Sequence, residues 1–102
     1  MQIPEFATYE AEALSKGFDA VLVRRWDPHA VIDEHAHPFD ASAVVVEGEM
    51  WLTEAGKTRH LLPGDTFELP QGTLHSERYG VEGATYWVAR RHGAAPSAGA
   101  DR

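Results

Sequence analysis

Two histidines separated by one residue, His35 and His37, are the residues of this chain best suited to bind a metal ion. On an extended strand their side chains point to the same face, because strand side chains alternate between the two faces. Neutral imidazole is a good ligand for transition metals such as Fe, Ni and Zn, whereas Mg and Ca prefer oxygen donors. The pair therefore predicts half of a metal site, whose other ligands come from elsewhere in the fold.

His75 is the expected third ligand. It follows Pro70 and Gly72 in the segment Pro-Gln-Gly-Thr-Leu-His, where turn-forming residues lead into an extended run. We therefore predict a site formed by His35, His37 and His75. The remaining histidines are interpreted as surface or hydrogen-bonded side chains: His29, His60 and His92.

The elements that must position these residues are short strands. From residue 18 onward, about eight β-type runs are separated by turn residues at intervals of about 8–12 residues, which is typical of an all-β sandwich or barrel. The expected strands are residues 18–26, 30–37, 43–47, 49–53, 57–62, 66–69, 75–79 and 84–91. The crossover helices that a parallel sheet requires are missing from this pattern.

The chain divides into three segments. Residues 1–17 form an N-terminal segment in which a short helix is expected over residues 9–16, ending at Gly17. Residues 18–92 form the barrel. Residues 93–102 are small, polar and rich in proline and glycine, so a disordered tail is expected there.

Composition excludes several classes of protein. The formal net charge of −7 disfavours nucleic acid and anionic membranes as partners, since both require a basic face. The chain has no cysteine, which excludes disulfides, thiolate ligands and cysteine nucleophiles. No apolar run approaches the roughly 18–20 residues of a membrane span, and no secretory signal is evident. A cytoplasmic protein is expected.

Two arginine pairs stand out in this acidic chain, Arg24 with Arg25 and Arg90 with Arg91. Strand alternation places the members of each pair on opposite faces. Both pairs are too small to form a nucleic-acid footprint, and we interpret them as solvated edges.

The segment around His75 resembles the second signature motif of the cupin superfamily, G-x5-P-x-G-x2-H-x3-N. It matches at four positions: Gly64, Pro70, Gly72 and His75. It departs at Tyr79, where the motif has asparagine.

The segment around His35 resembles the first cupin motif, G-x5-H-x-H-x3-4-E-x6-G. It matches at three positions: His35, His37 and Gly48. His29 stands where the motif has glycine, and Ala41 or Ser42 stands where it has glutamate.

This resemblance implies a double-stranded β-helix, or jelly-roll barrel, holding one divalent transition-metal ion (Fe, Ni, Zn or Mn) on the three histidines. The glutamate of the family is commonly a fourth ligand. Here Asp40 lies one position away from its place, and Glu77 shares a strand face with His75, so either carboxylate is a candidate fourth ligand. The preferred site uses the three histidines alone, with water or substrate at the remaining coordination positions.

Two further residues share a strand face with a proposed ligand. Asp33 and Tyr79 are candidates to accept a hydrogen bond from the second nitrogen of a ligating ring. Tyr79 is also the candidate catalytic residue, because a phenol near a metal can orient a substrate or donate a proton.

The expected function is that of a small metal-binding cupin, either a metal-dependent enzyme of dioxygenase or isomerase type acting on a small polar molecule, or a non-catalytic barrel that binds or senses a small molecule. A homodimer is also expected, with contacts from the N-terminal segment or the first strand, because an open sheet edge favours association.

Overall fold

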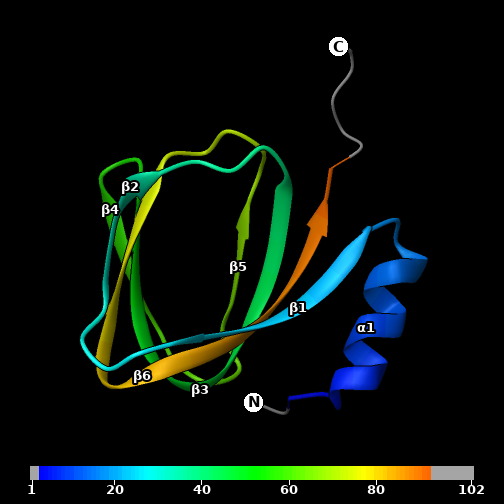
Figure 1. Cartoon of the computed structure of the whole chain (residues 1–102), viewed down its shortest axis with the longest axis horizontal. Helices are drawn as coiled ribbons and strands as arrows, with labels where there is room; N and C mark the ends of the chain where they lie inside the picture. Colours follow the sequence, from blue (N-terminus) through cyan, green and yellow to red (C-terminus); the bar gives the residue numbers. More distant parts are fainter. Residues whose placement is uncertain (1–2, 93–102) are drawn as a thin grey trace.

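The computed structural model describes residues 3–92. Within that range the chain forms one helix and six strands (Figure 1). In chain order they are α1 (Phe6–Ser15), β1 (Ala20–Trp26), β2 (Val31–His35), β3 (Asp40–Glu54), β4 (Lys57–Leu61), β5 (Thr66–Leu69) and β6 (His75–Arg91). The tail expected over residues 93–102 lies outside the described residues. The single described helix is too short to cross a membrane.

The two long strands, β3 and β6, each run through both layers of the barrel. The first half of β3 and the second half of β6 pair with β5 and β1, while their other halves pair with β4 and β2. All of these pairings are antiparallel. The prediction of an all-β barrel is confirmed. Two pairs of the expected strands are continuous, because residues 43–47 and 49–53 both belong to β3, and residues 75–79 and 84–91 both belong to β6.

β3 and β6 pair with each other along their whole length, and two glycines allow them to bend where the register of this pairing shifts. Gly48 on β3 and Gly83 on β6 have φ angles of 77° and 71°, which side-chain-bearing residues rarely adopt. A Cβ atom on Gly48 would lie 2.1 Å from the carbonyl oxygen of Gly83, and one on Gly83 would lie 2.1 Å from that of Trp26. The two backbones therefore approach more closely than any other residue permits.

The core lies between the two layers and follows strand alternation. Four of its side chains are almost completely buried: Val45, Met50, Leu52 and Tyr79. On β6 the alternation that buries Tyr79 also turns His75 and Glu77 inward. The pattern that builds the core thus brings polar residues into the barrel at one end.

Helix α1 lies outside the barrel beside β1 (Figure 1). The ring of Phe6 meets that of Trp87 edge-on, with 5.2 Å between centroids. The hydroxyl of Tyr9 donates to the carbonyl of Ser42 at 2.9 Å. Burial raises the pKa of Tyr9 to about 12. The helix starts three residues earlier than expected because these aromatic contacts hold its first turn.

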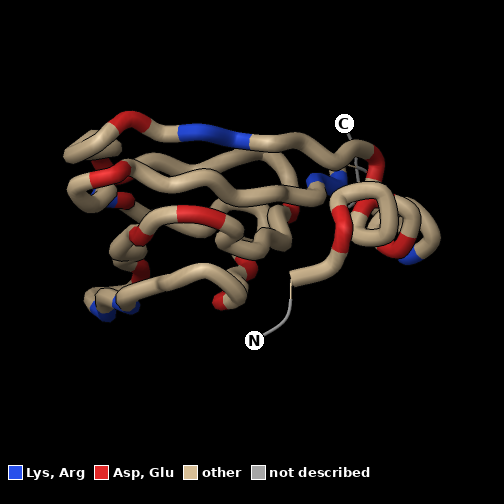
Figure 2. The backbone as a smooth tube through the Cα atoms, turned by 90° about the horizontal axis from the view of Figure 1, so that it is seen from below, with Lys and Arg blue, Asp and Glu red and all other residues tan. Residues whose placement is uncertain are grey.

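Along the backbone, Lys and Arg occur in short stretches between acidic residues (Figure 2), and exposed residues of both signs lie on the protein surface. On this surface the Nε2 atom of His60 lies 2.7 Å from Oε2 of Glu49, and its ring stacks on Trp51. The interpretation of His60 as a hydrogen-bonded surface side chain is confirmed.

Candidate metal centre

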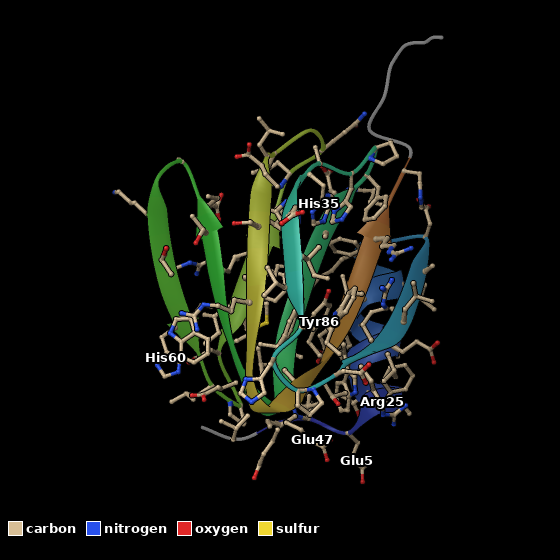
Figure 3. The ribbon with its side chains drawn as sticks, turned by 60° about the vertical axis from the view of Figure 1, so that its left-hand side comes forward. Glu5, Arg25, His35, Glu47, His60 and Tyr86 are labelled. Carbon is tan, nitrogen blue, oxygen red and sulfur yellow. The ribbon has the colours of Figure 1, made fainter. Side chains whose placement is uncertain are left out.

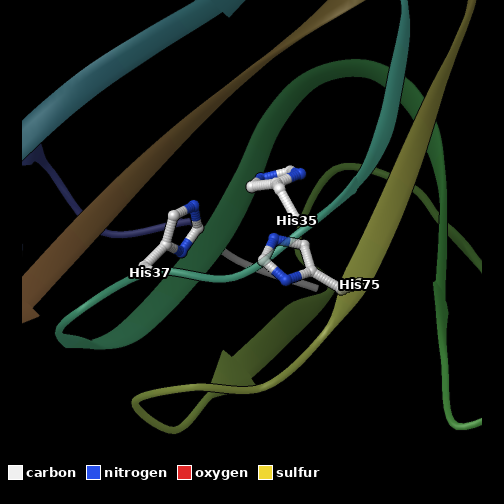
Figure 4. A group of neighbouring side chains, drawn as sticks. All are labelled: His35, His37 and His75. Atoms are coloured by element: carbon white, nitrogen blue, oxygen red, sulfur yellow. The ribbon is translucent and has the colours of Figure 1, made fainter.

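Three imidazole rings converge inside one end of the barrel (Figure 4). One ligand atom from each of His35, His37 and His75 lies within 4.8 Å of the other two. Figure 3 shows His35 near the end of the barrel opposite Glu47. Two ligands bound to one ion at about 2.1 Å lie about 3.0–3.4 Å apart. Small ring rotations would therefore bring the three nitrogens onto a common ion.

The local backbone explains this convergence. His35 ends β2 and is the register partner of His75, which begins β6. His37 lies two residues beyond the end of β2, in the loop rather than on the strand that was expected to continue to residue 37. Its carbonyl accepts a hydrogen bond from the backbone N–H of Gly72 at 3.0 Å. The turn before His75 therefore also holds His37 in place.

Backbone carbonyls orient two of the rings. Nδ1 of His35 donates to the carbonyl oxygen of Asp33 at 2.8 Å, and Nδ1 of His75 donates to that of Thr73 at 2.9 Å. A carbonyl oxygen only accepts, so Nδ1 carries the hydrogen in both rings and Nε2 faces the site. Asp33 thus takes the expected orienting role through its backbone, not through its carboxylate.

Glu77 brings a carboxylate to these nitrogens. Its Oε2 atom lies 3.2 Å from Nε2 of His75 and 3.8 Å from Nε2 of His35. The closer contact lacks hydrogen-bond geometry, and among residues 3–92 the buried Nε2 of His75 has no hydrogen-bond partner. In neutral His75 that nitrogen presents a lone pair to a carboxylate oxygen, a repulsive arrangement that a cation between the two would relieve. The donor set therefore fits a metal ion.

Tyr79 binds this carboxylate, and among residues 3–92 it has no hydrogen bond or ring stacking with the three histidines. Its hydroxyl donates to Oε1 of Glu77, and its ring stacks on Trp26. Burial, together with the neighbouring Tyr86 and Glu77, raises the pKa of Tyr79 far above its ordinary value. The hydroxyl stays protonated and positions Glu77.

The other candidate ligand, Asp40, is directed elsewhere. Its Oδ1 atom accepts the backbone N–H of Gln71 at 2.7 Å, and its Oδ2 atom lies 3.4 Å from Nε of Arg91. Ala41, at the glutamate position of the first motif, is buried and lines the cavity beside the histidines. The position faces the site, but its side chain is too short to reach an ion.

His37 is in the right protonation state to act as a ligand at neutral pH. Burial, followed by the charges of His75, His35, Arg90 and Arg24, lowers the pKa of His37 from 6.5 to about 4. A ring that is neutral near pH 7 keeps the lone pair of one nitrogen available for a metal.

A cavity of about 90 Å³ adjoins the histidines. Its walls are largely apolar, but Arg24 and Arg90 also line it. The interpretation of the arginine pairs as solvated edges is therefore wrong for these two members. The register of β1 on β6 turns one arginine of each pair inward, while Arg25 is exposed and Arg91 approaches Asp40.

Comparison with known proteins supports the resemblance. Residues 22–88 match the cupin domain family. The structure of KdgF from a Halomonas species is 26% identical with a TM-score of 0.61, over 69% of this chain and 66% of that one. The DMSP lyase DddQ from Ruegeria pomeroyi DSS-3 is 26% identical with a TM-score of 0.67, over 78% of this chain and 40% of that one.

A third similar structure is an RmlC-like cupin from Shewanella frigidimarina NCIMB 400, 26% identical with a TM-score of 0.61. The alignment covers 69% of this chain and 63% of that one, so the match spans less than two thirds of all three proteins. A search of curated protein sequences finds no match. The family match covers well over half of the chain and agrees with the two-layered antiparallel barrel: this chain belongs to the cupin family.

Proposed function

We propose that this cupin binds one divalent transition-metal ion through His35, His37 and His75 and acts through it on a small polar molecule. The observation that carries the proposal is the buried Nε2 atom of His75. Among the described residues it has no hydrogen-bond partner, and it faces a carboxylate and two further imidazoles. Nitrogen donors favour Fe, Ni and Zn, and a carboxylate oxygen also suits Mn.

Glu77 is proposed as the fourth donor. Three nitrogens and one carboxylate oxygen leave positions at which water or a substrate atom can bind. The bound ion would supply Lewis-acid polarisation of the substrate. The protein's own residues orient the donors: two backbone carbonyls hold His35 and His75, and Tyr79 holds Glu77.

The reaction class is proposed to be that of a metal-dependent dioxygenase-like or isomerase-like enzyme. The similarity to KdgF and to a DMSP lyase supports the use of this barrel for small-molecule chemistry. Glu77 is the only carboxylate among the described residues that line the cavity, and as the proposed donor to the ion it is not also assigned the role of a base.

Non-catalytic binding is the second candidate, and one observation favours it. Apart from the histidines and Glu77, the described residues that line the cavity are apolar side chains, two arginines and Tyr86. Burial raises the pKa of Tyr86, so this phenol stays protonated at neutral pH. These walls can bind a ligand but transfer no proton. A barrel that binds without metal would keep its affinity for a small probe acid such as propionate in His75→Ala.

Self-association is also proposed, as a homodimer that uses the N-terminal segment or β1. Val23 on β1 is 40% exposed, and α1 packs beside this strand. Light scattering at micromolar concentration tests this, and a monomer would contradict it.

Metal uptake tests the main proposal. Untagged protein is stripped with a chelator, loaded separately with Fe(II), Ni(II), Mn(II) or Zn(II), and analysed for metal content. Wild type should retain one equivalent of at least one metal, and so should His60→Ala, which alters only a surface histidine. His75→Ala should retain far less. Because His75 is buried, His37→Gln in the loop serves as a second variant that leaves the core intact. Wild-type protein that takes up none of the four metals would overturn the proposal.

A further inference from the structure

We propose that Arg24 and Arg90 form an anion-binding subsite beside the metal centre, which holds the carboxylate or phosphate group of a small organic acid. This inference adds a substrate class to the proposed function. It rests on that function only where it places the other end of the ligand at the metal. The subsite itself requires no metal.

The two arginines come from neighbouring strands. Arg24 on β1 is the register partner of Tyr86 on β6, and Arg90 on β6 is the partner of Ala20 on β1. Counted along β1, Arg24 lies four residues from Ala20, the partner of Arg90. Because this number is even, both arginines point to the same, inner face of the sheet. Both line the cavity that His35 also lines.

Neither guanidinium is neutralised within the part of the chain that the structure describes. No carboxylate there lies within ion-pair distance of Arg24 or Arg90, and the buried Nε atom of Arg90 has no hydrogen-bond partner. The outward members of the pairs differ, since Arg25 is solvated and Arg91 approaches Asp40. A buried donor without an acceptor is costly, so the Nε atom of Arg90 requires an explanation.

Aromatic rings support both guanidiniums. The Cζ atom of Arg24 lies 4.9 Å from the ring centroid of Trp26, and that of Arg90 lies 4.5 Å from the centroid of Phe39. Stacking fixes the guanidinium plane and leaves its N–H edges available to an acceptor. Burial, and secondarily repulsion by the positive charge of Arg24, lowers the pKa of Arg90. An anion between them would relieve this repulsion.

The cavity also restricts the rest of the ligand. A guanidinium fork matches the two oxygens of a carboxylate or a phosphate. Around it the walls include Phe67, Leu69 and Val88, which a bare inorganic anion would leave uncovered. With a volume of about 90 Å³, the cavity suits an acid of a few carbon atoms. Because His35 and His37 line the same cavity, the far end of such a ligand would face these two proposed metal ligands.

An NMR titration of metal-free, 15N-labelled protein tests the subsite. The probes are propionate, its neutral analogue propionamide, ethylphosphonate and inorganic phosphate. Propionate or ethylphosphonate should shift the Nε–H signal of Arg90, whereas propionamide should not. The tighter of the two organic anions identifies the preferred group, and inorganic phosphate should bind more weakly than ethylphosphonate. Arg24→Gln and Arg90→Gln should each weaken binding about tenfold or more, and Arg90→Lys should retain part of it.

Arg25→Gln is the matched control, because it removes an arginine from the same strand but from its outer face. It should bind the anions as wild type does. Equal affinity for propionate and propionamide, or equal losses in Arg24→Gln and Arg25→Gln, would overturn the subsite. Since the titration uses metal-free protein, a failure of metal binding leaves its outcome unaffected. Metal uptake without an arginine-dependent anion site would overturn this inference alone.

Discussion

Glu77 places a carboxylate oxygen 3.2 Å from Nε2 of His75, two residues earlier on the same strand. The first cupin motif supplies its carboxylate from a position that falls on Ala41 or Ser42 in this chain, and Ala41 lines the site with only a methyl group. Glu77 brings the carboxylate from the strand of the third histidine instead. As the proposed donor, Glu77 lies in the other layer of the barrel from Ala41, while the three histidines stand at the positions of the two motifs.

Replacing Glu77 by glutamine tests this donor. We expect Glu77→Gln to lower metal affinity about 10–100-fold, as loss of a partner at a metal site typically does. Without metal the variant should be at least as stable as wild type, because the charge that faces the lone pair of His75 is gone. Chelator competition and thermal unfolding measure the two effects. Glu82→Gln, which alters an exposed carboxylate on the same strand, is the control, and equal affinities in the two variants would contradict the assignment.

Tyr79→Phe tests whether the buried phenol positions Glu77. Removing the hydroxyl leaves Oε1 of Glu77 without its donor, which should lower the free energy of unfolding by about 1–3 kcal/mol. Metal affinity should fall less than in Glu77→Gln, because the carboxylate remains. A double-mutant cycle with Glu77→Gln, followed by urea unfolding, should reveal a coupling between the two positions. Additive effects would show that the hydroxyl acts independently of Glu77.

The histidine spacing and the regular strand pattern were sufficient to predict the barrel and the convergence of the three rings. The alternation of side chains along a strand also identified Glu77 as a neighbour of His75, because residues two apart on a strand share a face. The competing candidate, Asp40, could not be dismissed from sequence. Its carboxylate accepts a hydrogen bond from the backbone N–H of Gln71. This contact forms only when the two cupin motifs meet in the folded chain.

The arginines show that the alternation of side chains along a strand does not by itself predict which residue faces the cavity. Alternation predicted that Arg24 and Arg25 face opposite ways, but the inward member depends on the register of β1 against β6. A shift of one residue would have turned Arg25 into the cavity. The position of His37 similarly depends on a turn that folds back over the end of β2, which periodicity does not describe.

The anchoring of α1 predicts a pH dependence at high pH. The folded protein holds the pKa of Tyr9 at about 12 against an ordinary value of 10.0. Its stabilising contribution is complete below pH 10 and is lost as the pH rises towards 12, because the unfolded chain ionises first. Urea unfolding across this range should show a steeper loss of stability in wild type than in Tyr9→Phe. Identical slopes would contradict the burial of this hydroxyl against β3.

The close approach of the β3 and β6 backbones at Gly48 and Gly83 predicts that Gly48 cannot be replaced without loss of stability. Gly48→Ala adds a Cβ atom 2.1 Å from the carbonyl oxygen of Gly83, so one backbone must move and the bend in both long strands must open. We expect a loss of about 3 kcal/mol or more in the free energy of unfolding.

Gly17→Ala is the matched control, since Gly17 also has a positive φ of 97° but a Cβ atom there meets nothing within 4 Å. In that variant the free energy of unfolding should fall only by the roughly 1–2 kcal/mol that a left-handed backbone costs a residue with a Cβ atom. Equal losses in chemical denaturation would show that φ strain, rather than the close approach of the strands, sets the requirement for glycine. Because β3 and β6 run through both layers and β6 carries His75, Gly48→Ala should also weaken metal binding in the protein that still folds.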